Sequence, residues 1–468
     1  MPSPPVVVLD NGGSTIKAGV VVPNSGDDVD NLESHGVTLK PRTIVNAVIR
    51  SKGDKKTYFG HELEQCRDFS SLHYRLPFER GFLTDWDAQK AVWDGLFSQL
   101  LKVEPADHSL LITEPYFNLP NIQDVYDQFV FEEYEFQSYL RCAPAALLPF
   151  GSLFGSGLPA PECMLIVDSG FSFTHIVPLM NGKVLWKSVR RLDVGGKLMT
   201  NHLKELVSFR QWNMMDETHI VNDVKEKCCY VTAHFGADLE TCRKDPKRNE
   251  IVQEYVLPNF ADNRPGRVKA PIEVLAEGDQ VLVMNNERFA VPELLFRPTD
   301  IGLSQSGISR TIAEAISTLP QDVQGLFWAN IGLVGGNVKF PGFRQRLADE
   351  LRSLAPIQYE VHIHESSDPI VESWLAGAAF ARREPSVFSQ HVVTRAEYQE
   401  GGSNACRRKF PGWMARAGSN FNAGEQNADS LAEVHGDAII ATTTGRRAKA
   451  DARMKASTRG KARAKQGG

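Results

Sequence analysis

The sequence predicts an α/β protein with two lobes, each of which offers a glycine-containing turn to the same phosphate chain. One turn lies between Val167 and Pro178, where apolar residues lead into Asp168-Ser169-Gly170 and a second apolar run follows. This pattern is typical of a strand, a tight turn and a second strand. The chain opens with a near copy, Val6 to Gly19, built around Asp10-Asn11-Gly12-Gly13-Ser14. Glycine gives such a turn backbone freedom, and N–H groups that converge there can hold an anion.

A third glycine turn, Gly335-Gly336-Asn337, follows an apolar run that begins at Ile331 and precedes a helix expected from near Pro341. A joint of this kind places free N–H groups and the positive end of a helix dipole at one point. Each turn alone is more often a simple corner of the chain. The three together, in this order, favour a cleft that binds phosphate groups.

The amino-acid composition and the cysteines limit the classes of protein to which this chain can belong. The chain has 468 residues, 42% of them hydrophobic and 23% charged, which is enough for two or more cores. We find no apolar run of the roughly 20 residues that a membrane span needs. The segment Met1 to Pro5 lacks the basic and apolar regions of a secretory signal. Seven cysteines without a paired C-x-x-C spacing argue against a zinc cage and favour a reducing compartment.

Charge is concentrated at the C-terminal end. The segment 445–468 carries a net charge of +8, which leaves −13 for the rest of a chain whose total is −5. A block of like charge rich in Ala and Gly predicts a disordered, solvated tail. A nuclear-import signal and a contact with nucleic-acid phosphates remain open alternatives. The basic residues are Arg446, Arg447, Lys449, Arg453, Lys455, Arg459, Lys461, Arg463 and Lys465.

Periodicity gives the expected elements between the turns. They are a β-like run over Thr43–Ile49, an amphipathic helix over 85–101, a buried strand over Ser109–Thr113, helical segments up to Leu148 interrupted by Pro144, a hinge loop over Pro149–Pro161, a strand over Lys183–Val194, helices after Gly195-Gly196 and over 217–230, a polar loop region over 236–270, a strand with His362 and His364 facing solvent, and a helix over 369–382.

From about residue 5 to residue 410, the sequence resembles actin. The matching stretches are Asp10–Gly12, Thr84–Asp87, Thr113–Pro115, Val167–Pro178, Asp193–Gly196, Lys225–Val231, Asn286–Phe289, Gly335–Gly342, Arg395–Tyr398 and Arg407–Phe410. Further stretches resemble one branch of the actin-related proteins, namely Ile112–Asn118, Phe131–Tyr134, Ser172–Pro178 and Met215–His219.

The resemblance implies a two-lobed actin-like ATPase fold, with ribonuclease H-like lobes around a nucleotide cleft and a disordered basic C-terminal tail. It implies four subdomains and the tail: subdomain 1 at 1–30, 75–151 and 372–410; subdomain 2, with a shortened loop, at 31–74; subdomain 3 at 152–194 and 304–371; subdomain 4 at 195–303; and the tail at 411–468. Sugar kinases and chaperone ATPase domains share this general pattern of turns.

The resemblance also implies a nucleotide site for ATP or ADP. Asp10, Asn11, Gly12, Gly13, Ser14 and Lys17 would hold the phosphates from one side, and Asp168, Ser169 and Gly170 from the other. Lys225 and Glu226 would border the adenosine, and Gly335, Gly336, Asn337 and Phe340 would close the pocket. Asp10 and Asp168 would reach a water-coordinated Mg²⁺, an ion that keeps several waters and takes few carboxylates. For each glycine the alternative is tight-turn geometry alone.

Two departures from the actin pattern predict weak or absent catalysis. Pro144 stands where actin has a glutamine that orients the attacking water, and Phe171 stands where a second acidic residue lies beside the metal. Phe171 and Phe173 together crowd the turn. His175 remains, but an isolated histidine on a strand is more often structural. Phosphoryl transfer depends on positioning and electrostatics, so we predict no catalytic residue and a nucleotide that is structural rather than turned over.

The function implied by the resemblance is that of a nuclear subunit of a Swr-type chromatin-remodelling complex that exchanges a variant histone. Its partners would be a helicase-like remodeller ATPase and a small zinc-finger-type subunit, with nucleosome or histones contacted indirectly. It would be found in the nucleus and also the cytoplasm. A working ATPase or sugar kinase and a cytoskeletal polymer former are the alternatives. The short connection from Arg50 to Tyr58 argues against filaments, because actin uses a longer loop there to contact its neighbour.

Overall fold

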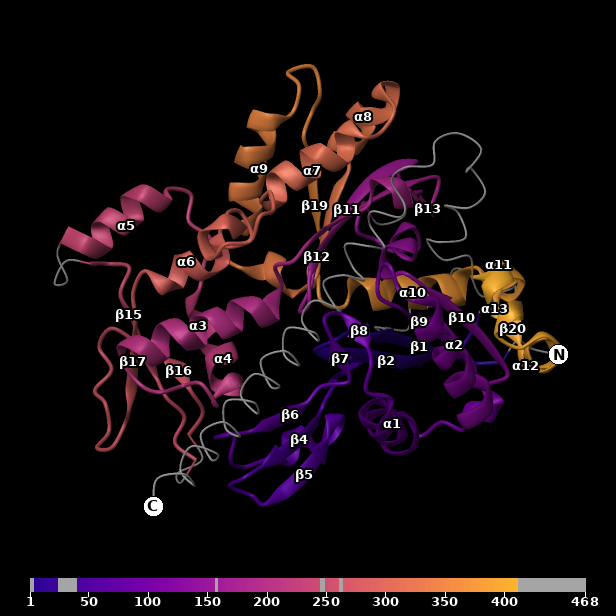
Figure 1. The fold of residues 1–468 in the computed structure, drawn as a ribbon, viewed down its shortest axis with the longest axis horizontal. Coiled ribbons are helices and arrows are strands. Elements are labelled where there is room, and N and C mark those ends of the chain that lie inside the picture. The colour runs from indigo at the N-terminus through magenta and orange to yellow at the C-terminus, as the bar shows by residue number, and fades with distance from the viewer. Residues whose placement is uncertain (1–3, 24–39, 156–158, 245–248, 261–263, 411–468) are drawn as a thin grey trace, which may run out of the picture. The chain divides into compact units, whose positions relative to one another are not determined.

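The first hairpin predicted from the sequence lies in a six-stranded sheet, in which β1 is a central strand and β2 is next to the edge strand (Figure 1). The structure is a computed structural model that describes residues 4–23, 40–155, 159–244, 249–260 and 264–410. Strand β1 pairs antiparallel with β2 and parallel with β9, so the hairpin has a parallel neighbour on one side. The sheet order is β20-β10-β9-β1-β2-β3. Its strands are β1 (Val6–Asn11), β2 (Thr15–Val21), β3 (Arg42–Val45), β9 (Ser109–Thr113), β10 (Ser138–Cys142) and β20 (Val393–Thr394).

The second hairpin occupies the same place in a second sheet. Strand β11 pairs antiparallel with β12 and parallel with β18. The register places Asp10 opposite Lys17 in the first hairpin and Asp168 opposite His175 in the second. The two halves therefore repeat one arrangement, with an aspartate one residue before the end of each first strand. The second sheet contains β11 (Cys163–Ser169), β12 (Thr174–Met180), β13 (Lys183–Val184), β14 (Arg190–Leu192), β18 (Ile331–Val334) and β19 (Ile363–Glu365).

Three small sheets lie outside these two. One has the order β5-β4-β6, one is the hairpin β7–β8, and one has the order β16-β15-β17. Strands β4 and β5 pair directly through a turn at residues 52–55. The strands are β4 (Val48–Ser51), β5 (Lys56–Phe59), β6 (His73–Arg75), β7 (Phe78–Glu79), β8 (Phe82–Leu83), β15 (Gln253–Val256), β16 (Arg267–Val268) and β17 (Val281–Met284).

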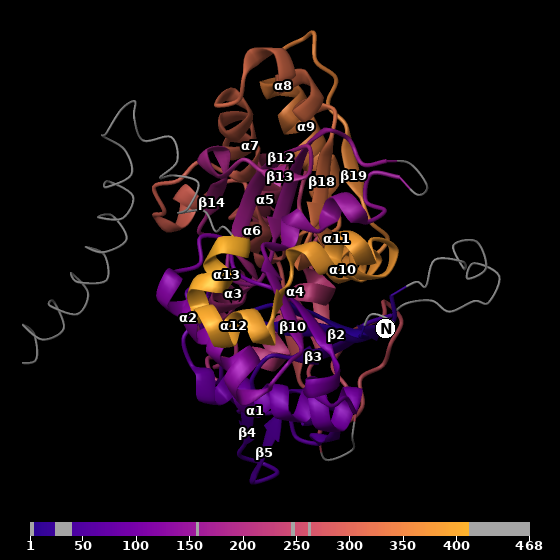
Figure 2. The same cartoon turned by 90° about the vertical axis from the view of Figure 1, so that its right-hand side faces the viewer.

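The helices cover both sheets. Helix α10 packs on β1 and β2, while α7 and α8 pack on β12 and β11 (Figures 1 and 2). The helices are α1 (Trp86–Gly95), α2 (Pro120–Gln128), α3 (Gly196–Arg210), α4 (Thr218–Cys228), α5 (Phe235–Lys244), α6 (Glu287–Glu293), α7 (Ile308–Ser317), α8 (Gln321–Trp328), α9 (Phe343–Leu354), α10 (Glu372–Arg383), α11 (Pro385–His391), α12 (Arg395–Gly401) and α13 (Ser403–Lys409).

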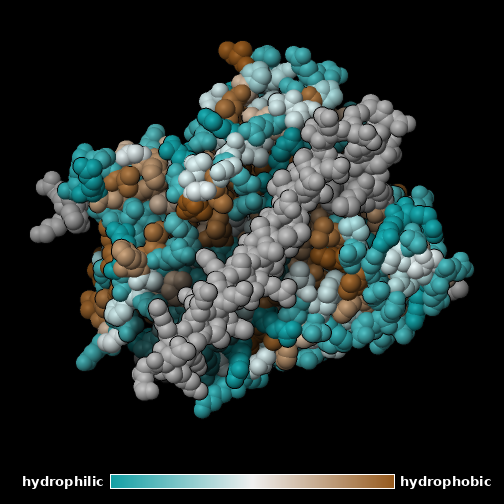
Figure 3. All heavy atoms as spheres, in the orientation of Figure 1, coloured by the Kyte–Doolittle hydropathy of each residue, from teal (hydrophilic) through white to brown (hydrophobic). Residues whose placement is uncertain are grey.

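Each large sheet has its own apolar core. The first core collects β1, β9 and β10 with α1 and α10, and Trp93 and Trp374 are almost fully buried in it. The second collects β11 and β18 with α3, α4, α7 and α9. Strands covered on both faces read as continuous apolar runs, and this explains why the hairpin strands stood out in the sequence. On the face shown in Figure 3, hydrophilic residues predominate and apolar ones form small groups.

Several expected elements differ from those observed. Residues 138–142 form strand β10 rather than a helix, because a parallel partner, β9, is available. The expected strand over 183–194 is two short strands separated by a 3-10 turn at Trp186–Ser188. The run Thr43–Ile49 is divided between β3 and β4, which belong to different sheets. The polar region 236–270 contains most of α5 together with β15 and β16.

Other expectations are confirmed or fall outside the described residues. Strand 109–113 is present, and helix 85–101 is α1 continued by a π-helical turn at Leu96–Leu101. All seven cysteines are free thiols, and among the described helices none is long and apolar enough to cross a membrane. The predicted tail at 411–468 and parts of the segments 149–161 and 236–270 lie outside the described residues.

Candidate nucleotide site

The first hairpin holds Asp10 in a fixed orientation. Its Oδ2 lies 3.3 Å from the Lys17 Nζ, its cross-strand partner, and its Oδ1 accepts a 2.8 Å hydrogen bond from the Thr113 Oγ1. The same Thr113 oxygen accepts a 3.0 Å bond from the Asn11 backbone N–H. The carboxylate is buried, so a lysine partner and a hydroxyl donor offset the cost of removing its charge from water.

Asn11 lies at the end of β1 with one side-chain atom unsatisfied. Its Nδ2 is 3.4 Å from both the Gln89 Oε1 and the Tyr126 hydroxyl, whereas its buried Oδ1 has no partner. Asn46 fastens the turn itself through a 2.9 Å bond from its Nδ2 to the Gly12 carbonyl. A buried acceptor without a partner is uncommon in a folded protein. Because consecutive residues of a strand face opposite sides, the Asn11 amide faces Gln89 and Tyr126 rather than the side that Asp10 faces.

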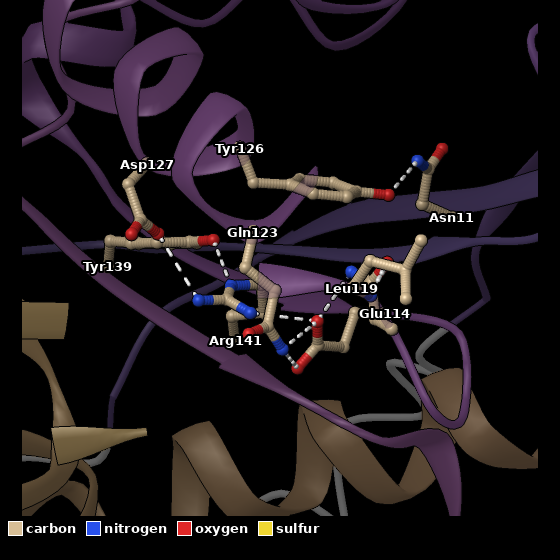
Figure 4. Close-up of polar contacts among 9 residues, drawn as sticks. Asn11, Glu114, Leu119, Gln123, Tyr126, Asp127, Tyr139 and Arg141 are labelled. Atoms are coloured by element: carbon tan, nitrogen blue, oxygen red, sulfur yellow. Dashed lines mark hydrogen bonds and ion pairs between the residues drawn. The ribbon is translucent and has the colours of Figure 1, made fainter. Parts of the chain in front are cut away.

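A buried ionic network lies next to the first hairpin, where Tyr126 of α2 contacts Asn11 (Figure 4). Arg141 on β10 lies 2.8 Å from a Glu114 oxygen and 3.4 Å from an Asp127 oxygen. Its Nε–H donates to the Tyr139 hydroxyl, and Gln123 on α2 donates to Glu114. Burial raises the pKa of Asp127 to about 6, and the Arg141 charge opposes that rise. The network joins β9, β10 and α2.

The second hairpin is tied to the third glycine turn. Ser169 Oγ is 2.8 Å from the Thr174 Oγ1 across the hairpin. The Asn337 Nδ2 donates to the Ser169 Oγ at 3.1 Å and to the Gly170 carbonyl at 2.7 Å. Gly335 adopts a φ of +96°, and a Cβ there would lie 2.3 Å from the Ser169 carbonyl oxygen. Only glycine allows this close approach between the two turns.

Helix α3 begins directly beneath the second hairpin. The Gly196 N–H donates to the Gly170 carbonyl at 3.0 Å, and the Lys197 N–H donates to the Phe171 carbonyl at 2.9 Å. These bonds satisfy two N–H groups that a helix start leaves open. A Cβ on Gly195 would lie 2.6 Å from the Phe171 oxygen, so the backbones are already in contact. The hairpin therefore has little freedom to move away from α3.

The two hairpins face one another. Tyr116 follows β9, and its hydroxyl donates to the Asp168 Oδ2 at 3.0 Å. A Cβ on Gly13 would lie 3.1 Å from the Ser172 Oγ. The Phe173 ring reaches the β7–β8 turn, where it would overlap any side chain on Gly81. The arrangement inferred from two distant glycine turns is therefore present.

Tyr116 is the site residue that the sequence analysis missed. Its hydroxyl accepts a 3.2 Å bond from the Ala145 N–H while donating to Asp168. Ala145 follows Pro144 in a 3-10 turn, so a tyrosine hydroxyl lies beside the position of the absent glutamine. Gln89, a glutamine elsewhere in the chain, is fully buried and its amide bonds with Asn46 and Asn11. The adjacency of Tyr116 to Thr113-Glu114-Pro115 is the only signal that the sequence offered.

Aromatic side chains crowd the outer side of the second hairpin. The Tyr116 and His175 rings are 4.5 Å apart, and His175 meets Phe173 edge-on at 6.0 Å. The Arg191 guanidinium lies 4.5 Å from the Phe173 ring centre. Burial, with a smaller contribution from the Arg191 charge, lowers the pKa of His175 to about 3. His175 is thus neutral near pH 7 and packs against the Tyr116 and Phe173 rings in tilted and edge-on geometry.

The electrostatics at Asp168 suit a cation. Burial raises the pKa of its carboxyl to about 6; the Tyr116 hydrogen bond opposes that rise and the nearby Asp10 charge adds to it. Two carboxylates whose charges repel one another favour a positive ion nearby. The described residues contain no group of three or more His, Cys, Asp or Glu arranged to hold a metal. Asp10 and Asp168 fit an ion such as Mg²⁺ that is held through its waters.

The two residues expected at the adenosine differ in burial, because Lys225 is buried and Glu226 is exposed. Lys225 is buried and donates to the Gly196 carbonyl, the Thr200 Oγ1 and the Asn222 Oδ1 at 2.9–3.3 Å, and burial lowers its pKa. Its ammonium joins α3 to α4. Glu226 is exposed and accepts a 2.7 Å bond from Asn222. The Lys225 ammonium is therefore satisfied by the protein itself, whereas the Glu226 carboxylate is exposed and has a hydrogen bond from Asn222.

Of the remaining predicted residues, two glycines border open space and Phe340 belongs to an apolar core. A Cβ on Gly336 would meet only Ile370, at 4.0 Å, and one on Gly170 would meet nothing nearer than 3.8 Å. This room is what a bound group beside each turn requires. Asn337 is buried against the second hairpin, and Phe340 packs in the second core. Ser14 accepts the Asn46 N–H through its carbonyl at 2.8 Å.

Comparison with known proteins agrees with this geometry. The family model described as Actin matches residues 1–411. The chain belongs to the actin family, and the two-lobed actin-like fold is confirmed.

Within that family, the chain is similar over most of its length to proteins named actin-related protein 6. It is 47% identical to actin-like protein ARP6 of Cryptococcus neoformans, over 89% of this chain and 86% of that protein. It is 40% identical to actin-related protein 6 of Neurospora crassa, over 87% of this chain and 95% of that protein. It is 36% identical to actin-related protein 6 of Drosophila melanogaster, over 85% and 97% respectively. The resemblance drawn from the motifs is confirmed.

Proposed function

We propose that this chain is a nuclear structural subunit of a Swr-type complex that exchanges a variant histone into nucleosomes. Its similarity to the actin-related protein 6 branch supports the proposal. The chain would pair with a helicase-like remodeller ATPase and a small zinc-finger-type subunit, and it would meet nucleosome or histones indirectly. It would reside in the nucleus, with a further pool in the cytoplasm.

Within that role, we infer that the cleft binds ATP or ADP and hydrolyses it slowly or not at all. The hydrogen bond from Tyr116 to Asp168 carries this inference. In phosphoryl transfer, the protein contributes by orienting the nucleophile and stabilising charge. Pro144 has no side-chain amide and no N–H to orient water, and the tyrosine hydroxyl beside it is already engaged by Ala145 and Asp168. The nucleotide would then act as a ligand that stabilises the closed lobes.

When bound, Mg²⁺ would shield the phosphate charges. Asp10 and Asp168 would hold its waters, and Lys17 would approach the phosphates once it is released from Asp10. The neutral His175 and the Phe173 ring would keep bulk water from the outer side of the second hairpin. In this proposal none of these residues acts as a base toward an attacking water.

Affinity purification of the full chain from nuclear extract tests the assembly. Recovery of a helicase-like motor, a small zinc-finger-type subunit and histones supports the proposal, and their absence contradicts it. A sustained ATPase rate from contaminant-free protein would favour the active-enzyme alternative. An increase in light scattering with ATP and salt would favour the polymer-forming alternative.

A further inference from the structure

Three buried side-chain amides lie next to the first glycine turn. They belong to Asn11 at the end of β1, Asn46 between β3 and β4, and Gln89 on α1. Asn46 and Gln89 have no exposed surface, and Asn11 is almost fully buried. Burying an amide is costly unless its N–H and carbonyl groups find partners, so the partners of these three show what the burial achieves.

The three amides bond with one another. The Gln89 Nε2 donates to the Asn46 Oδ1 at 3.2 Å, and the Asn46 Nδ2 donates back to the Gln89 Oε1 at 3.3 Å. The same Gln89 oxygen accepts a bond from the Asn11 Nδ2 at 3.4 Å. Gln89 is therefore the centre of an amide cluster that joins α1 to the end of β1 and to the connection between β3 and β4.

Asn46 extends the amide cluster to the backbone of the turn. Its Nδ2 also donates to the Gly12 carbonyl at 2.9 Å, and its backbone N–H donates to the Ser14 carbonyl at 2.8 Å. The Gly12–Gly13 peptide unit is trans, so its N–H points in the direction opposite to its carbonyl. The Gly13 N–H therefore points away from Asn46, and it keeps that direction as long as Asn46 stays in place.

The second glycine turn is held in a similar way. The Asn337 Nδ2 donates to the Gly170 carbonyl at 2.7 Å. Each of the two turns thus has one carbonyl bonded to a buried asparagine that comes from outside its own hairpin. At the first turn, the asparagine is itself held by two bonds to Gln89.

We propose that Gln89 is a positioning residue of the nucleotide site. It holds Asn46, and through Asn46 it holds the first turn in the shape that receives phosphate before a nucleotide binds. Gln89 reaches the turn only through Asn46 and Asn11, so it acts without touching the ligand. The proposal rests on the proposed nucleotide binding. Because a turn that is already ordered costs less to immobilise on binding, loss of Gln89 weakens binding even in a folded chain.

Equilibrium titration of the full chain with methylanthraniloyl-labelled ATP and Mg²⁺ tests the proposal. Gln89→Met keeps the length of the side chain, removes both of its bonding atoms and is expected to raise the Kd at least tenfold. Gln324→Met is the matched control, because it makes the same change on α8, where the amide donates to the Leu319 carbonyl at 2.9 Å. The control is expected to change the Kd less than twofold.

A purely structural role for Gln89 predicts a different result. Urea denaturation identifies a temperature at which every variant is folded, and at that temperature a loss of stability alone leaves the Kd unchanged. Gln89→Met combined with Asn46→Leu replaces both facing amides with apolar side chains, so neither is left without its partner. The double variant is expected to keep the weakened binding, because the Gly12 carbonyl has lost its donor. Binding of wild-type strength in either variant overturns the proposal.

Hydrogen exchange of the Asn46 backbone amide in nucleotide-free protein separates the amide cluster from nucleotide binding. Protection in the wild type and in Gln324→Met, with exchange at least tenfold faster in Gln89→Met, supports the hold on the turn. Rapid exchange in the wild type overturns it. Faster exchange in Gln89→Met without a change in Kd overturns the link to the nucleotide. A wild type that binds no labelled ATP refutes the proposed function, and this link with it, while amide exchange still shows whether the cluster holds the turn.

Discussion

Replacing Gly195 with alanine tests the role of α3 as the support of the second hairpin. The added Cβ would lie 2.6 Å from the Phe171 oxygen and the Ser172 carbonyl carbon, and 2.8 Å from the Phe173 nitrogen. All three are backbone atoms, so no side chain can turn aside. Ordinary contact begins at 3.4 Å, and the hairpin must therefore shift by about 0.8 Å relative to α3.

The expected cost has two parts. Overpacking of this kind costs about 1–3 kcal/mol. The shift also weakens the bonds from Gly196 to Gly170 and from Lys197 to Phe171, each worth about 1 kcal/mol net. We expect Gly195→Ala to lower the free energy of unfolding by about 2–4 kcal/mol. Because the hairpin then faces Gly13 at a changed distance, affinity for ATP should fall about tenfold or more, which is about 1.4 kcal/mol.

Urea denaturation and equilibrium binding of labelled ATP measure the two effects. Gly236→Ala is the control, because its Cβ would meet no atom within 4 Å inside α5. That change should stabilise the protein by up to about 1 kcal/mol and leave binding unchanged. A Gly195→Ala variant with wild-type stability and wild-type affinity would refute the reasoning about the hairpin's support.

Three further predictions concern charge, pH and turnover. Arg141→Met leaves two buried carboxylates without their cation and should cost about 3–5 kcal/mol in urea denaturation, whereas Arg407→Met removes a surface ion pair and should cost less than about 1 kcal/mol. His175→Phe keeps an aromatic ring in this packing and removes a pH dependence. Because the pKa of His175 is lowered to about 3, protonation of the unfolded chain below pH 6.5 destabilises the wild type, and we expect it to lose about 1–2 kcal/mol more than this variant between pH 7 and pH 5. Pro144→Gln alone should leave phosphate release unchanged because Tyr116 still occupies the adjoining position, whereas Pro144→Gln with Tyr116→Ala should raise single-turnover release at least tenfold.

Contrary results for these three are equally definite. Equal losses of unfolding free energy in Arg141→Met and Arg407→Met would show that the buried network stabilises the protein no more than a surface ion pair does. If the free energy of unfolding depended on pH in the same way for the wild type and His175→Phe, burial of a neutral His175 would not be the cause of the pH dependence. Turnover restored by Pro144→Gln alone would show that Tyr116 does not occupy the water's place.

Hydrophobic runs and glycine turns were enough to find both glycine-containing hairpins. Strands buried on both faces give continuous apolar runs, and each run here ends at an aspartate and a glycine. The strand at Ser138–Cys142 was missed because its apolar pattern is too short to distinguish a strand from a helix. Its extended conformation depends on backbone pairing with the neighbouring strand β9. The expected single strand over 183–194 fails because the two short strands pair with different parts of β12.

The site was less predictable than the fold, because it depends on contacts between distant residues. The sequence showed that Pro144 lacks an amide, but it could not show that the Tyr116 hydroxyl lies beside it. Lys225 was expected at the adenosine, yet three acceptors from α3 and α4 surround its ammonium. Periodicity places such a residue on a helix but does not determine which neighbours it meets.

The central claim is that the cleft retains a nucleotide without cutting it. The most direct measurement loads the purified, contaminant-free chain with ATP labelled at the γ-phosphate and Mg²⁺, removes the excess, and follows bound ATP, bound ADP and free phosphate for hours. We predict about one nucleotide per chain, still ATP, with phosphate release at background. Prompt release of one phosphate per chain, or a chain that retains no nucleotide at all, would contradict the account.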